Sequence, residues 1–167
     1  MSAKILVAVS ASSADTVLTS AIEAARKYNA NIVALHVVDP TPCYLAAADC
    51  NYGLIVEAMT EHGRKVATHV RHVLDNQACT AEVRMVTLPV SGMTIGRAIA
   101  IVADETGADL ILLGERSSSP WHWLSDDVAS EVVRCSGTPI QVAAERIKPR
   151  SAHHADVRWT DAFTVRI

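Results

Sequence analysis

The chain has 167 residues, half of them apolar and a fifth charged, with a formal net charge of −3 at pH 7. This composition excludes a disordered chain and fits one well-cored domain. The weak negative charge, without a Lys/Arg block, argues against nucleic acid or an anionic membrane as the main partner. No stretch of the sequence approaches the roughly 20 apolar residues of a membrane-spanning helix.

The beginning of the sequence resembles a secretory signal, because Lys4 precedes an apolar run over residues 5–9. That run is shorter than the roughly 7–15 apolar residues of such signals, so we interpret it as a buried first strand. The cysteines form no CxxC pair and lack zinc-site spacing; they are Cys43, Cys50, Cys79 and Cys135. Free thiols are typical of the reducing cytoplasm, where we expect the protein.

The first half of the chain alternates between apolar runs and amphipathic segments. Residues 4–10 are rich in branched side chains and predict a buried strand, whereas helical spacing of apolar residues predicts a helix over 14–28. A second buried strand is expected over 31–39 and is ended by Pro40. Residues 41–53 have no clear period and predict a surface excursion. The long amphipathic helix that follows has an apolar stripe formed by Ile55, Met59, Val66, Val70, Val73 and Leu74.

The second half continues the alternation. Residues 80–88 predict a strand, and residues 94–106 predict a helix that Gly107 ends. The most apolar run, over residues 109–115, predicts a fully buried strand. A last helix is expected over 126–136 and a fifth strand over 139–143.

Continuously apolar strands that alternate with helices predict an α/β fold, a single doubly wound, Rossmann-like domain over residues 1–144. The expected sheet has five parallel strands in the order 3-2-1-4-5, with helices on both faces. Such sheets bind ligands beyond the carboxyl ends of their strands, where the strand order reverses. A crevice is therefore predicted between the strands that end at Ser10 and Gly114.

The C-terminal tail, residues 145–167, differs in charge from the rest of the chain. It carries five Arg and Lys against three Asp and Glu, a net charge of +2, whereas the remainder has −5. Its last residues, 161–167, can form an extra strand at an exposed sheet edge or a dimer contact. A loosely held tail is the alternative.

Four stretches of the chain resemble the universal stress protein family, and together they span about residues 3–143: KILVAVSASS, ALHVVDP, TGADLILLGERS and VASEVVRCSGTPIQVA. The resemblance implies a five-stranded parallel sheet, as the alternation of elements also predicts. It implies a cytoplasmic homodimer, often joined through the edge of the fifth strand, here PIQVA. Members of the family divide into those that bind ATP and those that do not.

In the ATP-binding members, the first strand ends with an Asp that contacts the nucleotide. This chain has Ser10 at that position, after Ala8 and Val9. Val37 matches the residue that meets the adenine. The resemblance therefore places these residues around the base and ribose, with the carboxylate replaced by a hydroxyl.

The family's phosphate motif is Gly-x2-Gly-x9-Gly-Ser/Thr. Gly114 matches its first glycine, and Ser117 replaces the second. Aligned backwards from the last helix, Asp126 and Asp127 replace the closing Gly-Ser/Thr pair; counted forward from Ser117, Asp127 and Val128 replace it. The pair is absent in either alignment.

These replacements weaken a phosphate site for physical reasons. Glycine lets backbone N–H groups approach a phosphate without a clashing Cβ, and the helix N-terminus attracts the anion. Asp126 or Asp127 can cap that helix with its own carboxylate instead. Like charges about 4 Å apart near a surface repel by several kcal/mol. Arg116 with the serines at 117–119 can still form a different anion cradle, since Arg supplies a fork of donors.

Other clusters carry weaker signals. His62, His69 and His72 lie on one long helix, where a solvated flank is favoured over a metal site. Trp121 and Trp123 lie beside the predicted crevice and suit either packing or a partner contact. Neither a nucleophile elbow nor a P-loop occurs, so the sequence does not support catalysis.

We therefore expect a universal-stress-type regulatory or interaction protein that is not an enzyme, has no cofactor and does not bind ATP in the family's manner. Its expected partners are a second copy and an unknown protein, with no nucleic acid and no membrane. The alternative is a sensor that binds ATP, another adenine nucleotide or a small anion through the loop after Gly114. The candidate nucleotide-crevice positions are Ala8, Val9, Ser10, Val37, Gly114, Arg116, Ser117, Asp127 and Val128.

Overall fold

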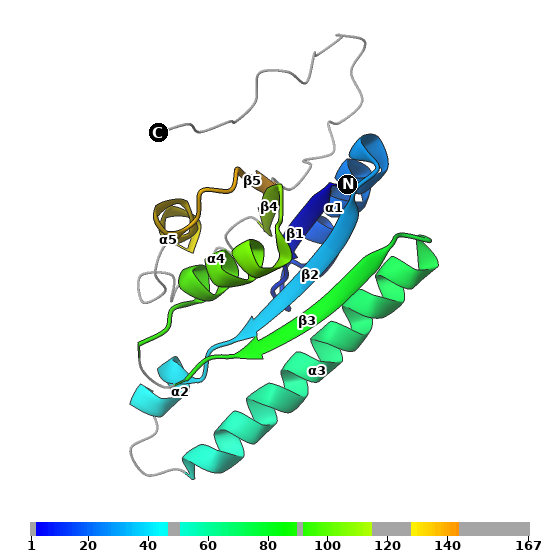
Figure 1. Ribbon diagram of the computed structural model, residues 1–167. Helices are drawn as coiled ribbons and strands as arrows, with labels where there is room; N and C mark the ends of the chain where they lie inside the picture. The colour runs from blue at the N-terminus through cyan, green and yellow to red at the C-terminus, as the bar shows by residue number, and fades with distance from the viewer. Residues whose placement is uncertain (1–2, 47–50, 90–91, 115–127, 144–167) are drawn as a thin grey trace, which may run out of the picture.

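Strands and helices alternate in the computed structural model, which describes residues 3–46, 51–89, 92–114 and 128–143 (Figure 1). The elements are β1 (Lys4–Ala8), α1 (Ala14–Tyr28), β2 (Asn31–Val38), α2 (Thr41–Ala46), α3 (Tyr52–Asn76), β3 (Ala81–Thr87), α4 (Ile95–Thr106), β4 (Leu110–Gly114), α5 (Val128–Cys135) and β5 (Ile140–Ala143). The strands form one five-stranded parallel sheet in the order β3-β2-β1-β4-β5. The predicted fold class and strand order are confirmed.

The core lies on both faces of the sheet, and β1 runs through its centre. Ile5 and Val7 pack with α1 and α3 on one face, whereas Leu6 packs with α4 and α5 on the other. All three side chains are at most 2% exposed. A strand buried on both faces has no polar side, which is why residues 4–10 are so apolar. Among the described helices, none is both long and apolar enough to cross a membrane.

The segment over residues 41–53, expected to lack regular structure, contains the short helix α2 and the first residues of α3. Asp39 Oδ1 accepts a hydrogen bond of 2.9 Å from the backbone N–H of Thr41, and Pro42 occupies the first turn, where a missing N–H costs nothing. The Asn51 side chain then caps α3 by accepting from Gly53 N at 3.1 Å. Periodicity misses a helix of six residues because it completes fewer than two turns.

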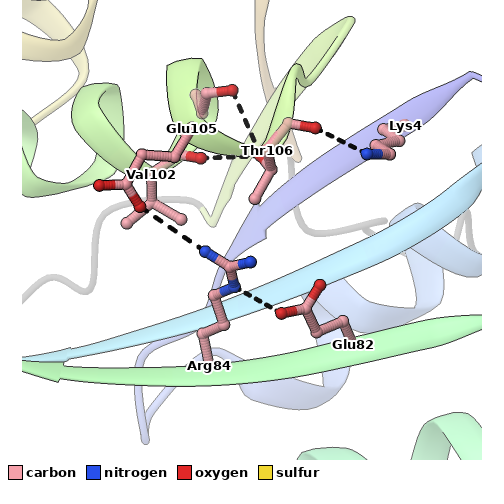
Figure 2. Close-up of polar contacts among 7 residues, drawn as sticks. Lys4, Glu82, Arg84, Val102, Glu105 and Thr106 are labelled. Carbon is pink, nitrogen blue, oxygen red and sulfur yellow. Dashed lines mark hydrogen bonds and ion pairs between the residues drawn. The ribbon is translucent and has the colours of Figure 1, made fainter.

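Helix α4 is fixed to β1 at its C-terminus. The Lys4 ammonium donates to the Thr106 carbonyl at 2.8 Å (Figure 2). The backbone N–H of Lys4 donates to Asp109 Oδ2 at 2.9 Å. A cation at the last carbonyls of a helix is favourable. Gly107 ends the helix with a φ of +62°, as predicted.

An ion cluster covers the outer strand β3. The Arg84 guanidinium donates to Glu82 at 2.6 Å and lies 3.7 Å from Glu105 on α4 (Figure 2). The hydrogen bond that Arg84 donates to Glu82 and the negative charges of both carboxylates raise the pKa of Arg84, against the effect of burial. Arg84 therefore joins the edge of the sheet to α4.

Helix α3 lies close against β2 and β3 because Gly63 has no side chain. A Cβ at this buried position would lie 2.7 Å from Val38 Cγ2, 3.0 Å from Met85 Sδ and 3.3 Å from His36 Cδ2. Contacts this short force neighbouring atoms to shift. The glycine is thus required by the distance between helix and sheet, although glycine disfavours a helix interior.

We expect Gly63→Ala to lower the free energy of unfolding by about 1–2 kcal/mol, because overpacking of about 1–3 kcal/mol outweighs a helix-propensity gain of up to about 1 kcal/mol. Urea unfolding followed by circular dichroism measures this difference. The control is Gly53→Ala near the exposed start of α3, where the added Cβ meets Asn51 Oδ1 at 3.3 Å. A Gly63→Ala protein as stable as the control would contradict the packing argument.

Candidate functional site

The predicted crevice lies where β1 and β4 run side by side and the strand order reverses. From β1 the chain turns outward to β2 and then β3, whereas β4 and β5 lie on the other side. Ala8 is in register with Leu113, so Ser10 and Gly114 follow at the same carboxyl edge. The position derived from the sequence is confirmed as the switch point of the sheet.

Serine hydroxyls gather at this point. Ser10 Oγ lies 2.6 Å from Ser13 Oγ and 3.3 Å from Ser12 Oγ. Ser13 is the N-cap residue of α1, yet its hydroxyl makes no capping bond and pairs with Ser10 instead. Ser13 also covers Gly114, since a Cβ there would lie 2.7 Å from Ser13 Oγ. Ser13 thus connects two predicted crevice residues, Ser10 and Gly114.

The end of β1 is held from β2. Val9 N donates to Leu35 O at 2.8 Å, and the buried ring of His36 donates from Nδ1 to Val9 O at 2.8 Å. Because a carbonyl accepts and does not donate, Nδ1 carries the proton in this bond. Gly63 on α3 leaves room for the His36 ring. Through Val9, these contacts fix the position from which Ser10 projects.

The other candidate residues that the structure describes lie at the border of the hydrophobic core. Ala8, Val37 and Val128 are partly buried and pack against the apolar cluster under α4 and α5. Val37 lies on β2, where it is in register with Val86 of β3. Strand β1 separates β2 from β4, the strand that ends at Gly114. The structure therefore brings Ser10 and Gly114 together and places Val37 further along the same edge. Arg116, Ser117, Asp126, Asp127, Trp121 and Trp123 lie outside the described residues.

A buried carboxylate, missed by the sequence analysis, joins α5 to α4 at the same edge. Glu131 is 11% exposed in its side chain, and its Oε1 accepts from Thr94 Oγ1 at 2.5 Å. Thr94 in turn accepts from Arg97 N at 3.3 Å and caps α4. The carboxyl group packs on Gly96, where a Cβ would lie 2.7 Å from Oε2. A negative charge is favourable at a helix N-terminus; a lone Glu in an amphipathic helix gave no signal of this role.

The histidines of α3 lie on its outer surface. His69 Nε2 is 3.0 Å from Asp15 Oδ1 of α1, and His72 Nε2 is 3.1 Å from Asn76 Nδ2. His69 and Asp15 are 54% and 83% exposed in their side chains. No cluster of three or more metal-ligating side chains is found in the part of the chain that the structure describes. His69 instead links α1 to α3.

A model of the universal stress protein family matches residues 1–143. The chain belongs to this family. Universal stress proteins of known structure share its fold: the one from Burkholderia pseudomallei is 23% identical with a TM-score of 0.66, and the match covers 85% of this chain and 96% of that one. No curated protein matches the chain.

Two further universal stress proteins show the same architecture. The universal stress protein UspA from Lactobacillus plantarum is 22% identical and has a TM-score of 0.58. The match covers 85% of this chain and 97% of that one. A universal stress protein from Archaeoglobus fulgidus, solved in complex with dAMP, is 21% identical with a TM-score of 0.57, and the match covers 85% of this chain and 98% of that one. Likeness at this identity establishes the fold.

We expect Gly114→Ala to lower the free energy of unfolding by about 1–2 kcal/mol, because its Cβ would displace Ser13 Oγ and break the bond to Ser10. In a Ser13→Ala background the same change should cost less, by at least about 0.5 kcal/mol. Chemical unfolding of the four proteins of this double-mutant cycle measures the coupling. Gly137→Ala is the control, since nothing lies within 4 Å of its Cβ position. Additive effects would mean that Ser13 does not pack on Gly114.

Proposed function

We propose that this universal stress protein acts as a regulatory or interaction module and does not bind ATP in the manner of the family's ATP-binding members. The observation that carries this proposal is the serine cluster at the switch point. Ser10 takes the position of the nucleotide-contacting Asp, and its hydroxyl is engaged by Ser13 at 2.6 Å. A hydroxyl bound within the protein is a weaker partner for a ligand than a free carboxylate, since charged hydrogen bonds are the stronger ones.

The contact between Ser13 and Gly114 supports the same proposal. A glycine serves a phosphate site by leaving the space of its missing Cβ to the ligand. At Gly114 that space faces Ser13 Oγ, 2.7 Å from the Cβ position. A phosphate would have to displace the Ser13 side chain and break its bond to Ser10.

We propose a binding role without catalysis. The hydroxyl of Ser10 contacts those of Ser12 and Ser13, whereas a nucleophilic serine needs a base within hydrogen-bond reach. The proposed partners are a second copy of this chain and an unknown protein, with no cofactor, nucleic acid or membrane. The free thiols of Cys43, Cys79 and Cys135 support the cytoplasm as its location.

We expect the purified full-length protein to release well under one adenine nucleotide per chain on denaturation, as measured by chromatography and mass spectrometry. Added Mg-ATP at millimolar concentration should leave its melting temperature unchanged. A ligand at about 100 times its dissociation constant would add about 2.7 kcal/mol to the free energy of unfolding, or about 5–10 °C for a chain of this size. A shift of that size, or a stoichiometric nucleotide, would refute the proposal.

A sensor for a nucleotide or small anion is the second candidate. It is favoured by the uncapped start of α1, whose N–H groups lie beside three serine hydroxyls. The Archaeoglobus relative was solved with dAMP. Here Arg116 and Ser117 would supply the remaining donors. If a ligand binds, Arg116→Ala should weaken it, whereas Arg97→Ala on α4 should not; equal affinities would exclude this version.

The two sheet edges support a homodimer through β5. Edge strand β3 carries Glu82 and Arg84, and charges on an edge oppose pairing with another strand. Edge strand β5, of sequence IQVA, has no charge, and its Val142 is 49% exposed. An uncharged edge with an exposed apolar side chain suits a second copy, which presents the same edge across a two-fold axis.

We expect Val142→Lys to raise the dissociation constant of the dimer at least about tenfold, because the two-fold axis brings two lysines into the interface. Sedimentation equilibrium over a range of concentrations measures it. The matched control is Ala81→Lys, an exposed position on the opposite edge strand. Equal dissociation constants for both variants would exclude β5 as the interface.

A further inference from the structure

The edge of β5 has two different faces. Val142 is in register with Leu113, so it lies on the face that α4 and α5 cover, and it is 49% exposed. Gln141 is in register with Leu112, on the face of α1, and is exposed. A strand that pairs with β5 should therefore present apolar side chains on the α5 face and polar side chains on the other.

The C-terminal end of this chain has that pattern. Within residues 161–167, of sequence DAFTVRI, the side chains of Phe163, Val165 and Ile167 alternate with Thr164 and Arg166. A period of two with one apolar face is the pattern of a half-buried strand. Phe163 is also the single phenylalanine of the chain. The segment is thus chemically matched to β5.

The opposite edge is a poor match for the same segment. Glu82 and Arg84 occupy the face of β3 toward α4, and Val83 and Met85 face α3 on the other side. On one face of β3, Phe163 and Val165 would therefore lie beside the ion pair of Glu82 and Arg84. On the other face they would lie outside the area that α3 covers. Burial of a charge without its partner is costly, so the β3 edge disfavours this strand.

The chain is long enough to reach the edge of β5 within one molecule. Residues 144–160 connect Ala143, the end of β5, to Asp161. A segment of this length spans up to roughly 60 Å, whereas neighbouring strands lie about 4.8 Å apart. The entropy of loop closure grows slowly with length, so a long connection adds little cost. A strand that returns directly from the carboxyl end of β5 pairs antiparallel, whereas a parallel strand needs a crossover back to the other end of the sheet.

We propose that residues 161–167 add to the edge of β5 as a sixth, antiparallel strand of the same chain, with Val165 and Phe163 on the face of Val142. We further propose that this strand regulates dimerisation, which rests on the proposed β5 homodimer. The tail strand and a second copy of the chain compete for the same edge of β5. Only chains whose tail is detached from β5 can then form the dimer. The larger the fraction of chains with a bound tail, the higher the apparent dissociation constant of the dimer. Release or removal of the tail turns dimerisation on.

The test compares the full-length chain with a chain that ends at residue 144 and with two full-length variants. Val165→Glu places a charge on the apolar face of the tail strand, and Thr164→Glu places the same charge on its polar face as a matched control. Sedimentation equilibrium should give a dimer dissociation constant about tenfold lower for the truncated chain and for Val165→Glu. Thr164→Glu should behave as the unchanged protein.

Backbone amide hydrogen exchange provides a readout that is independent of the dimer. At concentrations below dimerisation, the amides of residues 163–166 and the edge-facing amides of β5 should be protected in the full-length chain and in Thr164→Glu. They should lose protection in Val165→Glu, whereas the β5 amides bonded to β4 should keep it. Exchange of residues 163–166 at unprotected rates in the full-length chain would overturn the sixth strand. A truncated chain that stays monomeric at all concentrations would overturn the dimer and the competition, while protected tail amides would still support the strand.

Discussion

The hydrogen bonds at Val9 fix the end of β1 and thereby the position of Ser10 at the switch point of the sheet. Val9 N bonds to Leu35 O and Val9 O accepts from His36 Nδ1, both at 2.8 Å. They extend the pairing of β1 with β2 beyond Ala8, where the regular strand ends. Since the ring of His36 is buried, its N–H has little competition from water, and a bond of this kind is expensive to leave unmade. Ser10 begins the turn to α1 from this fixed point.

The position of His36 depends in turn on the packing of α3. Its ring lies close to Gly63, whose missing side chain allows the helix to approach the sheet. Gly63 on α3 thus makes room for the ring of His36, and this ring holds the carbonyl of Val9, the residue directly after the central strand. Glu131 and Thr94 serve the corresponding purpose on the other face, where they fix the start of α4 against α5. On both faces of the sheet, the residues near the switch point are therefore held by contacts within the protein.

Much of this architecture could be predicted because the burial of a strand determines which of its residues are apolar. The apolar runs at 4–10 and 109–115 lack a polar side because β1 and β4 are covered on both faces, and Gly107 marks the end of α4 through its left-handed φ. The position of Ser10 and Gly114 at the switch point then follows from strand order.

The side-chain contacts at the switch point could not be predicted in the same way. The pairing of Ser13 with Ser10, and its cover of Gly114, depend on side-chain directions in a turn that has no period. Glu131 bonds to Thr94 across 37 positions of sequence, and nothing in its own helix indicates a buried partner. The helix α2 was missed because its signals, Asp39 and Pro42, are local capping features rather than a repeat.

One edge strand, β3, carries charged side chains and the other, β5, carries none. This difference follows from how the helices α1, α3, α4 and α5 cover the five strands. Helix α3 packs on β3 and β2, whereas on the opposite face α4 packs on β2 and β1, so the face of β3 toward α4 has less helix above it. Arg84 projects from this strip, and its guanidinium reaches Glu105 on α4 (Figure 2). Charges suit β3 because its exposed strip lies in water. At β5 the exposed side chains are Gln141 and Val142, and exposure of the valine to water is unfavourable. A strand of four residues with an apolar side chain at its open edge is stabilised by a neighbour, and this one physical need can be met by a second copy or by the end of the chain itself.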